Sequence, residues 1–301
     1  MHASSPTATL LGLSLVAAMT ANAQDEPAAA ARERAAPVAL VTGSTDGLGR
    51  EVARRLAATG AHVIVHGRNE ERGQALVREI EGAGQGSARF YRADLASLAE
   101  VRVLAEAILR DYDRLDVLVN NAGIWLERAD GRQLSRDGHE MHFAVNYLSG
   151  FLLTRLLLPR LVASAPSRIV NVSSIAQSPI DFDDVMLERG YGDGRAYAQS
   201  KLAQVMFTVD LARELEGRGV FVAALHPATM MNTSMVLERG ARPRATVEEG
   251  AEAVMHLLTA PDLESGQYFN GSRPARANDQ AYDEAARERL RHLSRALTGL
   301  P

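Results

Sequence analysis

Tyr197 and Lys201 stand four residues apart in a segment whose pattern predicts a helix over residues 196–216, so their side chains share one helix face. A tyrosine hydroxyl titrates at about pH 10 and is a poor acid–base catalyst at neutral pH without help. A neighbouring ammonium group lowers the pKa of the phenol because it favours the phenolate. The pair therefore predicts proton transfer to a carbonyl that receives hydride, or from an alcohol that gives hydride up.

Lys201 is the only lysine among 33 basic residues, so the other 32 are arginine. A lysine placed at random would follow one of the seven tyrosines by four residues only about 2% of the time. Since arginine serves everywhere else, the one lysine indicates a position where a compact ammonium is required and a planar, forked guanidinium does not replace it.

A glycine-rich turn follows the first predicted strand, residues 38–41, and leads into a predicted helix at 47–59. Glycines allow a tight turn and let the backbone approach a pyrophosphate, while the helix N-terminus supplies free N–H groups and a positive dipole end. The alternative is a plain strand-to-helix turn. Because the turn opens a series of strands and helices, it predicts dinucleotide binding through Gly43, Ser44, Thr45, Gly47, Leu48 and Gly49.

The second predicted strand, residues 62–65, is followed by His66, Gly67 and Arg68. An acidic residue at this place would accept hydrogen bonds from the ribose 2′-hydroxyl of NAD. Gly67 stands there instead, and the following Arg68 suits a 2′-phosphate. This favours NADP (NADPH) over NAD, and the alternative is a surface arginine in an arginine-rich chain.

Short β-branched runs alternate with longer helical stretches from Pro37 onward. This alternation predicts one α/β domain over residues 37–301, a doubly wound parallel sheet of the Rossmann type, with no second domain. The further strands are predicted at 88–92, 117–119, 168–172, 221–225 and 267–269, and the further helices at 69–81, 97–113, 143–161, 196–216 and 247–259.

Four motifs in this order resemble the short-chain dehydrogenase/reductase family. They are the TGxxxGxG turn, Asn120-Asn121-Ala122-Gly123, Asn171-Val172-Ser173-Ser174, and Tyr197-x-x-x-Lys201. The resemblance extends over about residues 37–298. Within the family the chain is most similar to retinol-dehydrogenase-like NADP-dependent reductases, through the stretches 143–154, 196–203 and 290–301.

The resemblance implies a catalytic role for four residues. Tyr197 would be the acid/base, and Lys201 would also bind the nicotinamide ribose hydroxyls. Ser174 would hydrogen-bond the substrate oxygen, and Asn146 would hold a water that links Lys201 to solvent. The alternatives are a strand-end cap at Ser174 and, at Asn146, a polar residue that only satisfies backbone groups.

The resemblance also implies further cofactor contacts. Asp94 would meet the adenine, unless it only starts a helix. After the sixth strand the family usually has Pro-Gly; here Ala228 replaces the glycine, and Thr233, which would meet the nicotinamide carboxamide, falls one residue late. The residues added to the cofactor site, besides Tyr197 and Lys201, are Asp94, Leu95, Asn120, Ala122, Gly123, Pro227 and Thr233.

The substrate is expected to be a small apolar carbonyl or alcohol. Residues 230–243 carry Met230, Met231, Met235 and Leu237, which predict a mobile lid over an apolar ligand or, equally, simple core packing. The stretch 178–195 either overhangs the substrate site or is a solvated loop. The alternatives to a reductase are a catalytically silent nucleotide sensor or scaffold, and a dehydratase or epimerase.

Composition excludes several other classes. The formal charge of -4 argues against nucleic-acid binding, and the absence of cysteine excludes disulfides and thiolate catalysis. Histidine spacing predicts no metal site. The helices at 143–161 and 196–216 could pair in a homodimer or homotetramer, as in the resembling family.

Residues 1–36 differ from the rest and resemble a secretory signal peptide with a linker. Residues 10–18 are apolar, too short for a membrane span, and residues 21–23 read as a cleavage site after which residues 1–23 would be removed. No lysine or arginine precedes the apolar run, so the alternatives are a disordered extension and a start codon placed too far upstream. The compartment stays open: an NADP enzyme favours the cytoplasm, and a functional signal would direct the chain to the periplasm or outside.

Overall fold

The computed structural model describes residues 1–2, 36–126 and 131–301. Residues 37–301 form one compact unit, distinct from residues 1–36. The predicted signal segment at residues 10–23 lies outside the described residues. Within the described part, no helix is both long and apolar enough to cross a membrane.

A single sheet, with strand order β3-β2-β1-β4-β5-β6-β7-β8, forms the centre of this unit. The strands are parallel up to β7, and the edge strand β8 is antiparallel to β7. The doubly wound parallel sheet expected from the sequence is confirmed. The strands are β1 (Val38–Val41), β2 (His62–Gly67), β3 (Ser87–Arg92), β4 (Val117–Asn120), β5 (Ser167–Val172), β6 (Val220–His226), β7 (Tyr268–Asn270) and β8 (Arg273–Ala275).

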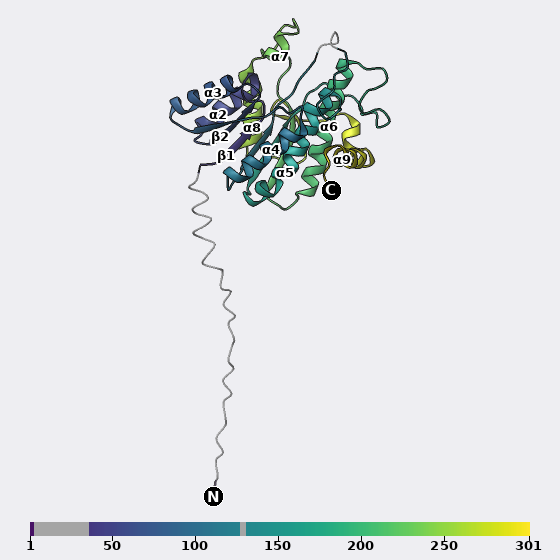
Figure 1. Cartoon of the computed structure of the whole chain (residues 1–301). Coiled ribbons are helices and arrows are strands. Elements are labelled where there is room, and N and C mark those ends of the chain that lie inside the picture. The colour runs from purple at the N-terminus through teal and green to yellow at the C-terminus, as the bar shows by residue number, and fades with distance from the viewer. Residues whose placement is uncertain (3–35, 127–130) are drawn as a thin grey trace. The chain divides into compact units, whose positions relative to one another are not determined.

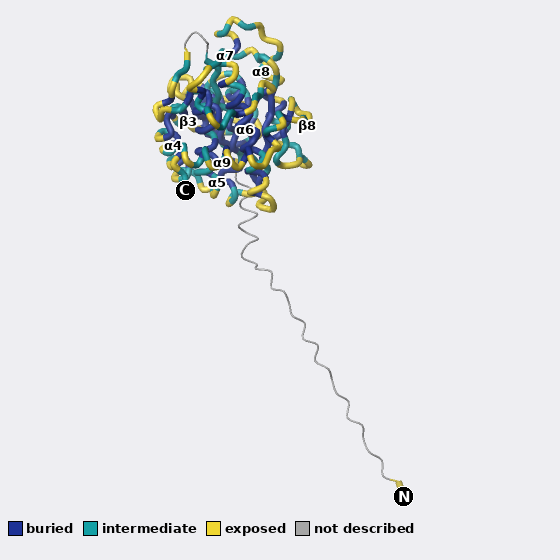
Figure 2. The backbone as a smooth tube through the Cα atoms, turned by 90° about the vertical axis from the view of Figure 1, so that its right-hand side faces the viewer, coloured by how far each residue is buried: buried dark blue, intermediate teal, exposed yellow. Residues whose placement is uncertain are grey.

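Helices cover both faces of this sheet (Figure 1). One apolar core joins the sheet to α4, α5, α6 and α9, and the other joins it to α2, α3 and α8. Figure 2 shows the buried segments running through the middle of the unit, α6 among them. The helices are α2 (Gly47–Ala58), α3 (Glu70–Ala83), α4 (Leu98–Asp111), η2 (Phe143–Leu148), α5 (Ser149–Ala163), α6 (Asp193–Glu214), α7 (Ser234–Leu237), α8 (Val247–Thr259), η3 (Asp279–Tyr282) and α9 (Glu284–Thr298).

The sequence pattern gave no sign of β8, α7 or α9, and it predicted one helix where the structure has two. Residues 143–148 form a π-helical turn before α5 begins at Ser149. π-helical turns inside helices are frequent at functional sites, and this one carries Asn146.

Helix α4 begins with a side-chain cap, because the Ser97 hydroxyl accepts a hydrogen bond from the Glu100 N–H. The reciprocal bond of a capping box is not formed there. The Glu100 carboxylate instead accepts from the N–H of Asp94 at 2.8 Å, so it holds the turn that follows β3.

Helix α9 packs on the helices that the sequence predicted to pair across a dimer. The buried Arg287 of α9 forms an ion pair with Asp210 of α6 at 2.8 Å. The hydroxyls of Ser294 and Tyr147 meet at 2.7 Å, which joins α9 to η2. Part of the predicted pairing surface is thus covered by the same chain, and a dimer or tetramer, which stays a prediction, would use the remaining faces.

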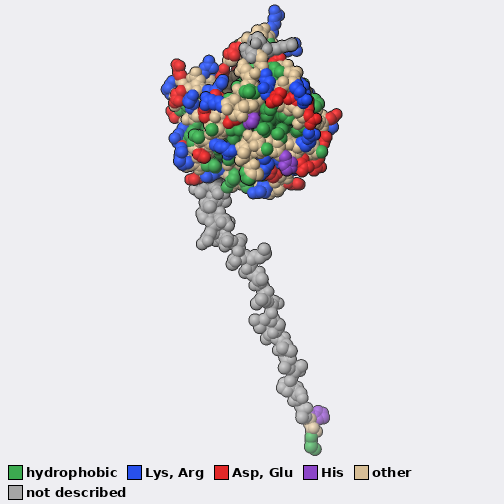
Figure 3. Space-filling model, turned by 45° about the vertical axis from the view of Figure 1, so that its right-hand side comes forward, with side chains coloured by type: hydrophobic (Ala, Val, Ile, Leu, Met, Phe, Trp, Pro, Cys, Tyr) green, Lys and Arg blue, Asp and Glu red, His purple; other side chains and the backbone are tan. Residues whose placement is uncertain are grey.

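The charges on the surface are mixed in sign. On the face that Figure 3 shows, basic side chains are interspersed with acidic ones. A single-sign field that would attract a polyanion is therefore not formed on that face.

Candidate active site

Strand β1 lies between β2 and β4, so the chain order reverses at the β1–β4 pair. In open α/β sheets, ligands bind in the crevice beyond the carboxyl ends of the strands at such a point. The structure places two predicted motifs there: the glycine-rich turn, residues 42–49, follows β1, and residues 120–123 follow β4.

Hydrogen bonds tie these two motifs together. The Thr42 hydroxyl accepts from the N–H groups of Asn121 and Ala122, each at 3.0 Å. The Asn121 amide donates to the carbonyl of Thr42 at 2.8 Å. Gly43 has φ +63°, and a Cβ there would lie 2.9 Å from the Cα of Ala122. Glycine is therefore required at this position by both conformation and space.

The side chain of His66, at the end of β2, holds the glycine-rich turn in place by a hydrogen bond. The sequence did not reveal this role. Its Nδ1 accepts a hydrogen bond from the N–H of Gly43 at 3.1 Å. Burial lowers the pKa of His66 to about 4, so the ring stays neutral at physiological pH. The hydroxyl of Ser44 accepts from the N–H of His66 at 2.9 Å. Ser44 and Leu48 are both buried, and the N–H of Ser44 donates to the carbonyl of His66 at 2.9 Å, which ties the turn to β2.

Two arginines meet near the place predicted for the adenosine ribose. Arg68 follows β2 and is exposed, and Gly67 faces Arg92 of β3 in the strand register. The Arg92 Nε donates to the Arg68 carbonyl at 3.3 Å. A Cβ on Gly67 would clash with the Thr45 side chain, so Thr45 lies against this position. Arg92 was not among the residues predicted from the sequence.

The residues predicted to lie beside the adenine and its ribose differ in where their side chains point. Asp94 accepts from the N–H of Ala96 at 3.1 Å, and Leu95 is buried. The Asn120 side chain turns into the protein, where its amide donates to Asn171 at 2.8 Å. Contact between Asn120 and a cofactor would therefore be through its backbone.

Helix α6 presents Lys201 to the end of β5. Lys201 is only 4% exposed, and its Nζ donates to the carbonyl of Val172 at 2.9 Å. Burial lowers the pKa of Lys201 to about 7. The Nζ lies 5.6 Å from the centroid of the Tyr197 ring, so the two residues do share the predicted face.

The electrostatics of Tyr197 differ from the expectation. The sequence predicted that the Lys201 ammonium would lower the pKa of this tyrosine. In the structure burial raises the pKa of Tyr197, and the nearby Ser174 hydroxyl acts in the opposite direction without cancelling the effect. The expectation was wrong because the same burial that disfavours the phenolate also removes charge from the lysine.

Asn146 lies across from Lys201 and is almost fully buried. Its side chain holds both backbone groups of Ile124, with Oδ1 accepting at 2.7 Å and Nδ2 donating at 3.1 Å. A Cβ on Gly123 would lie 3.4 Å from both Asn146 Oδ1 and Lys201 Nζ. Asn146 Oδ1 and Lys201 Nζ thus face the same glycine. The Asn146 side chain satisfies the backbone groups of Ile124, and it still lies beside Gly123 in the candidate site.

Ser174 stands at the end of β5, beside Tyr197. Its hydroxyl accepts from the N–H of Ala176 at 3.1 Å. The preceding Ser173 donates to the carbonyl of Lys201 at 2.7 Å, which fastens β5 to α6. Hydrogen bonds between this strand and helix therefore set the spacing of Ser174, Tyr197 and Lys201.

Aromatic side chains that the sequence did not single out surround the Tyr197 ring. The Trp125 ring stacks on it, with centroids 5.2 Å apart and planes at 28°. The edge of the His142 ring approaches it at 6.4 Å. These contacts leave the hydroxyl side of Tyr197, next to Ser174, as the part available for chemistry.

The segment after β6 returns over the glycine-rich turn. A Cβ on Gly47 would lie 3.1 Å from Thr233 Cγ2, and the Ser234 hydroxyl donates to the Asp46 carboxylate at 2.6 Å. Pro227 is buried at the start of this segment. Met231 packs against Gly250 of α8, whereas Leu237 is 51% exposed. Core packing therefore applies to Met231, and a mobile lid over an apolar ligand stays a prediction for the segment.

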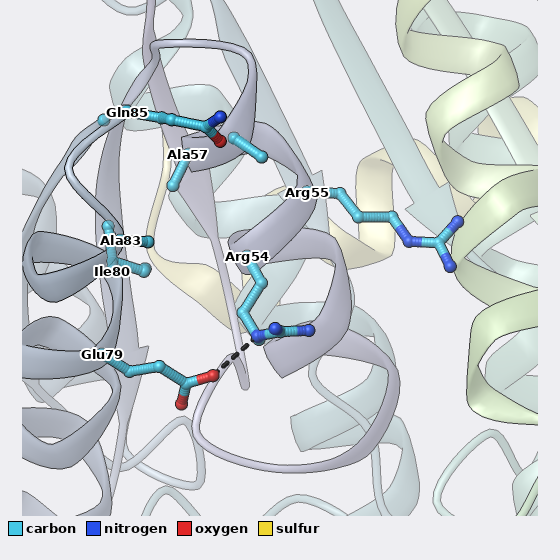
Figure 4. Close-up of a pocket in the computed structure, with 9 residues that line it drawn as sticks. Arg54, Arg55, Ala57, Glu79, Ile80, Ala83 and Gln85 are labelled. Atoms are coloured by element: carbon cyan, nitrogen blue, oxygen red, sulfur yellow. Dashed lines mark hydrogen bonds and ion pairs between the residues drawn. The ribbon is translucent and has the colours of Figure 1, made fainter.

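A cavity of about 220 Å³ lies elsewhere, between the last turns of α2 and α3 (Figure 4). Arg54 and Glu79 form an ion pair in its wall at 2.7 Å. The last turn of α2 lies at the opposite end of that helix from the glycine-rich turn. None of the predicted site residues lines this cavity, so we do not connect it with the chemistry at Tyr197.

Comparison with known proteins shows which family this sequence resembles. Residues 37–243 match the model of the short chain dehydrogenase family. Human retinol dehydrogenase 11 is 37% identical over 88% of this chain and 86% of its own, and mouse retinol dehydrogenase 13 is 38% identical over 87% and 83%.

Solved structures with a similar fold point to the same family. The Pseudomonas aeruginosa RhlG/NADP active-site complex is 29% identical with a TM-score of 0.65, covering 79% of this chain and 95% of the other. A short chain dehydrogenase from Burkholderia cenocepacia J2315 in complex with NADP is 27% identical with a TM-score of 0.62, over 78% and 95%. The chain therefore belongs to the short-chain dehydrogenase/reductase family and is an NAD(P)-dependent oxidoreductase that acts on CH–OH groups.

Proposed function

We propose that this enzyme is an NADP-dependent carbonyl reductase for apolar small molecules, with Tyr197 as the acid/base. The observation that carries the proposal is the convergence of polar groups beside the β1–β4 crevice. Lys201 Nζ and Asn146 Oδ1 face Gly123, and Ser174 lies next to Tyr197. These residues come from four separate parts of the chain, and packing alone does not require this combination.

When bound, the reduced nicotinamide would supply the hydride that adds to the carbonyl carbon. Tyr197 then gives a proton to the carbonyl oxygen, and the Ser174 hydroxyl hydrogen-bonds the same oxygen. Burial raises the pKa of Tyr197, so its hydroxyl carries the proton that the alkoxide formed by hydride addition would take. Lys201 and Asn146 lie where they could bring a replacement proton from solvent to Tyr197.

The residues near the crevice fit a dinucleotide. Gly43 and Gly47 both have positive φ, which allows the tight turn between β1 and α2 that a pyrophosphate-binding loop uses. At the ribose end, Arg68 and Arg92 offer two guanidinium groups and Gly67 offers no carboxylate. This arrangement supports NADP over NAD.

An apolar substrate is supported by the side chains at the rim. Ile175, which directly follows Ser174, is 58% exposed, and Leu237 of α7 is 51% exposed. An apolar substrate held at Ser174 would cover Ile175 and remove its side chain from water. Because the similar curated proteins are retinol dehydrogenases, retinoid-like aldehydes belong among the first substrates to test.

The test is reduction of a panel of aldehydes and ketones, followed through NADPH consumption. Tyr197→Phe should abolish turnover while NADPH binding persists. Tyr191→Phe is the matched control, because the Tyr191 hydroxyl has no hydrogen-bond partner among the described residues. Equal turnover in wild type and Tyr197→Phe would refute the mechanism. NADPH binding without turnover of any substrate in wild type would instead support a nucleotide sensor.

A further inference from the structure

Trp125 is held from three directions at a position beside the proposed acid/base. Asn146 binds both backbone groups of the preceding Ile124. The N–H of the following Leu126 donates to His142 Nε2 at 3.0 Å. The indole itself stacks on Tyr197. The backbone on both sides of Trp125 is therefore fixed, and the indole ring lies against the Tyr197 ring.

His142 is itself held rigidly. Its Nε2 accepts from Leu126, so the ring proton is on Nδ1, which donates to the Glu140 carboxylate at 2.8 Å. Both Glu140 and His142 have no solvent exposure. A buried carboxylate–imidazole pair thus holds the backbone directly after Trp125, in residues 121–126 that follow β4.

The other face of the indole is covered by Arg239. The guanidinium carbon lies 4.0 Å from the centroid of the Trp125 ring. Arg239 also donates to the carbonyl of Leu126 at 2.6 Å and forms an ion pair with Asp193, the first residue of α6, at 3.2 Å. About a fifth of each of these two charged side chains is exposed, so the pair is stronger than a fully solvated one.

Arg239 belongs to a segment that is closed on itself, residues 230–245, which we call the cover segment. The N–H of Arg244 donates to the carbonyl of Met230, and that of Asn232 donates to Ala245. Its helix α7 lies at the top of Figure 1, and Ser234 contacts Asp46. The cover segment therefore contacts the glycine-rich turn at one end and the Trp125 indole at the other.

We propose that Trp125 determines substrate specificity by filling the space on one side of Tyr197, and that Arg239 clamps it there. This inference rests on the proposed function for its chemistry. One face of the indole lies on Tyr197 and the other lies under Arg239. A large group attached to the reacting carbon of the substrate would therefore collide with the indole on this side of Tyr197. The site then favours unbranched aldehydes over ketones with a large group on the reacting carbon.

The indole N–H has no hydrogen-bond partner among the described residues, although the atom is buried. Among the described residues the indole contacts the Tyr197 ring and the Arg239 guanidinium, so we expect its stacked position to depend on these two contacts. Removing the clamp should therefore release the indole toward water.

The clamp can be tested without turnover, because Trp125 is the only tryptophan in the chain and protein fluorescence reports on it alone. In Arg239→Ala we expect red-shifted emission and an acrylamide quenching constant raised about threefold, since a cation–π contact and an ion pair are lost. Arg242→Ala, in the same segment and exposed, should match wild type. Unchanged emission and quenching in Arg239→Ala would overturn the clamp.

Specificity is tested with hexanal, an unbranched aldehyde, and acetophenone, a ketone with a phenyl group on the reacting carbon. Trp125→Ala should raise the ratio of kcat/KM for acetophenone to that for hexanal about tenfold, with a smaller rise in Trp125→Phe. Val103→Ala, an exposed apolar position on α4, is the control. An unchanged ratio in Trp125→Ala would refute the specificity role. If wild type reduces no carbonyl, the proposed function fails, and the fluorescence result still decides the clamp.

Discussion

The Nζ of Lys201 lies 2.9 Å from the carbonyl oxygen of Val172, so the only lysine of the chain is bound to the last residue of β5. The next residue, Ser173, returns a hydrogen bond to the carbonyl of Lys201. This reciprocal pair fastens α6 to β5 and places the Lys201 ammonium, Tyr197 and Ser174 at one end of the sheet. From this placement we expect that an arginine does not replace the lysine.

Lys201→Arg should lose nearly all turnover, although it conserves charge. The Nζ is enclosed by the Val172 carbonyl and by Gly123, where a Cβ would already approach it to 3.4 Å, and a forked guanidinium is larger than this space. The measurement is kcat with NADPH and an aldehyde, with Arg218→Lys on an exposed turn as the reverse control. Near-normal kcat in Lys201→Arg would show that the ammonium is not essential.

Arg68→Ala and Arg92→Ala should each weaken NADPH binding about tenfold, because each removes a charge-assisted hydrogen bond to the 2′-phosphate. Binding of NADH, which lacks that phosphate, should be unchanged in both variants. The dissociation constants can be measured by titration without substrate, with Arg110→Ala on α4 as the control. Equal losses for NADPH and NADH would contradict the assignment of these arginines to the 2′-phosphate.

Gly43→Ala should lower the free energy of unfolding by about 2–4 kcal/mol, since it combines an unfavourable φ with a steric clash against Ala122. Gly84→Ala is matched in φ, at +72°, but its Cβ would meet nothing within 4 Å. It should therefore cost only about 1–2 kcal/mol. Denaturant unfolding of the two variants separates conformational strain from the clash, and equal losses would mean that the approach of Ala122 is unimportant.

His66 should make the enzyme less stable in mild acid. As the pH falls from 6.5 to about 4, the unfolded chain takes up a proton at this residue and the folded chain does not. The free energy of unfolding therefore falls with decreasing pH, by about 3 kcal/mol from this residue alone. His66→Asn keeps an acceptor for the Gly43 N–H and does not titrate. If wild type and this variant lose equal stability between pH 7 and 4, then His66 is not the neutral support of the turn.

Much of the fold was predictable because its signals are local. Alternating β-branched and helical stretches reveal strands and helices of a buried parallel sheet, and glycine at Gly43 reveals a backbone that other residues cannot adopt. Helix α9 was missed because its burial is decided by distant partners such as Asp210 and Tyr147.

The candidate site was predictable as a set of residues, since Tyr197, Lys201, Ser174 and Asn146 stand in recognisable motifs. The direction of the pKa shift of Tyr197 was not predictable from the sequence. A sequence shows that a lysine follows a tyrosine by one helical turn, and it does not show that both lose water in the fold. Desolvation reversed the expected direction of the Tyr197 pKa shift.

By itself, the sequence determined the family and the parallel sheet and predicted a candidate set of reacting residues, because each depends on short-range spacing. Only the tertiary structure decided what surrounds the reacting group. Trp125, Arg239 and Asp193 come from three separate segments, and no spacing in the chain predicts that they stack and pair beside Tyr197. Contacts between segments far apart in sequence depend on how the whole domain packs.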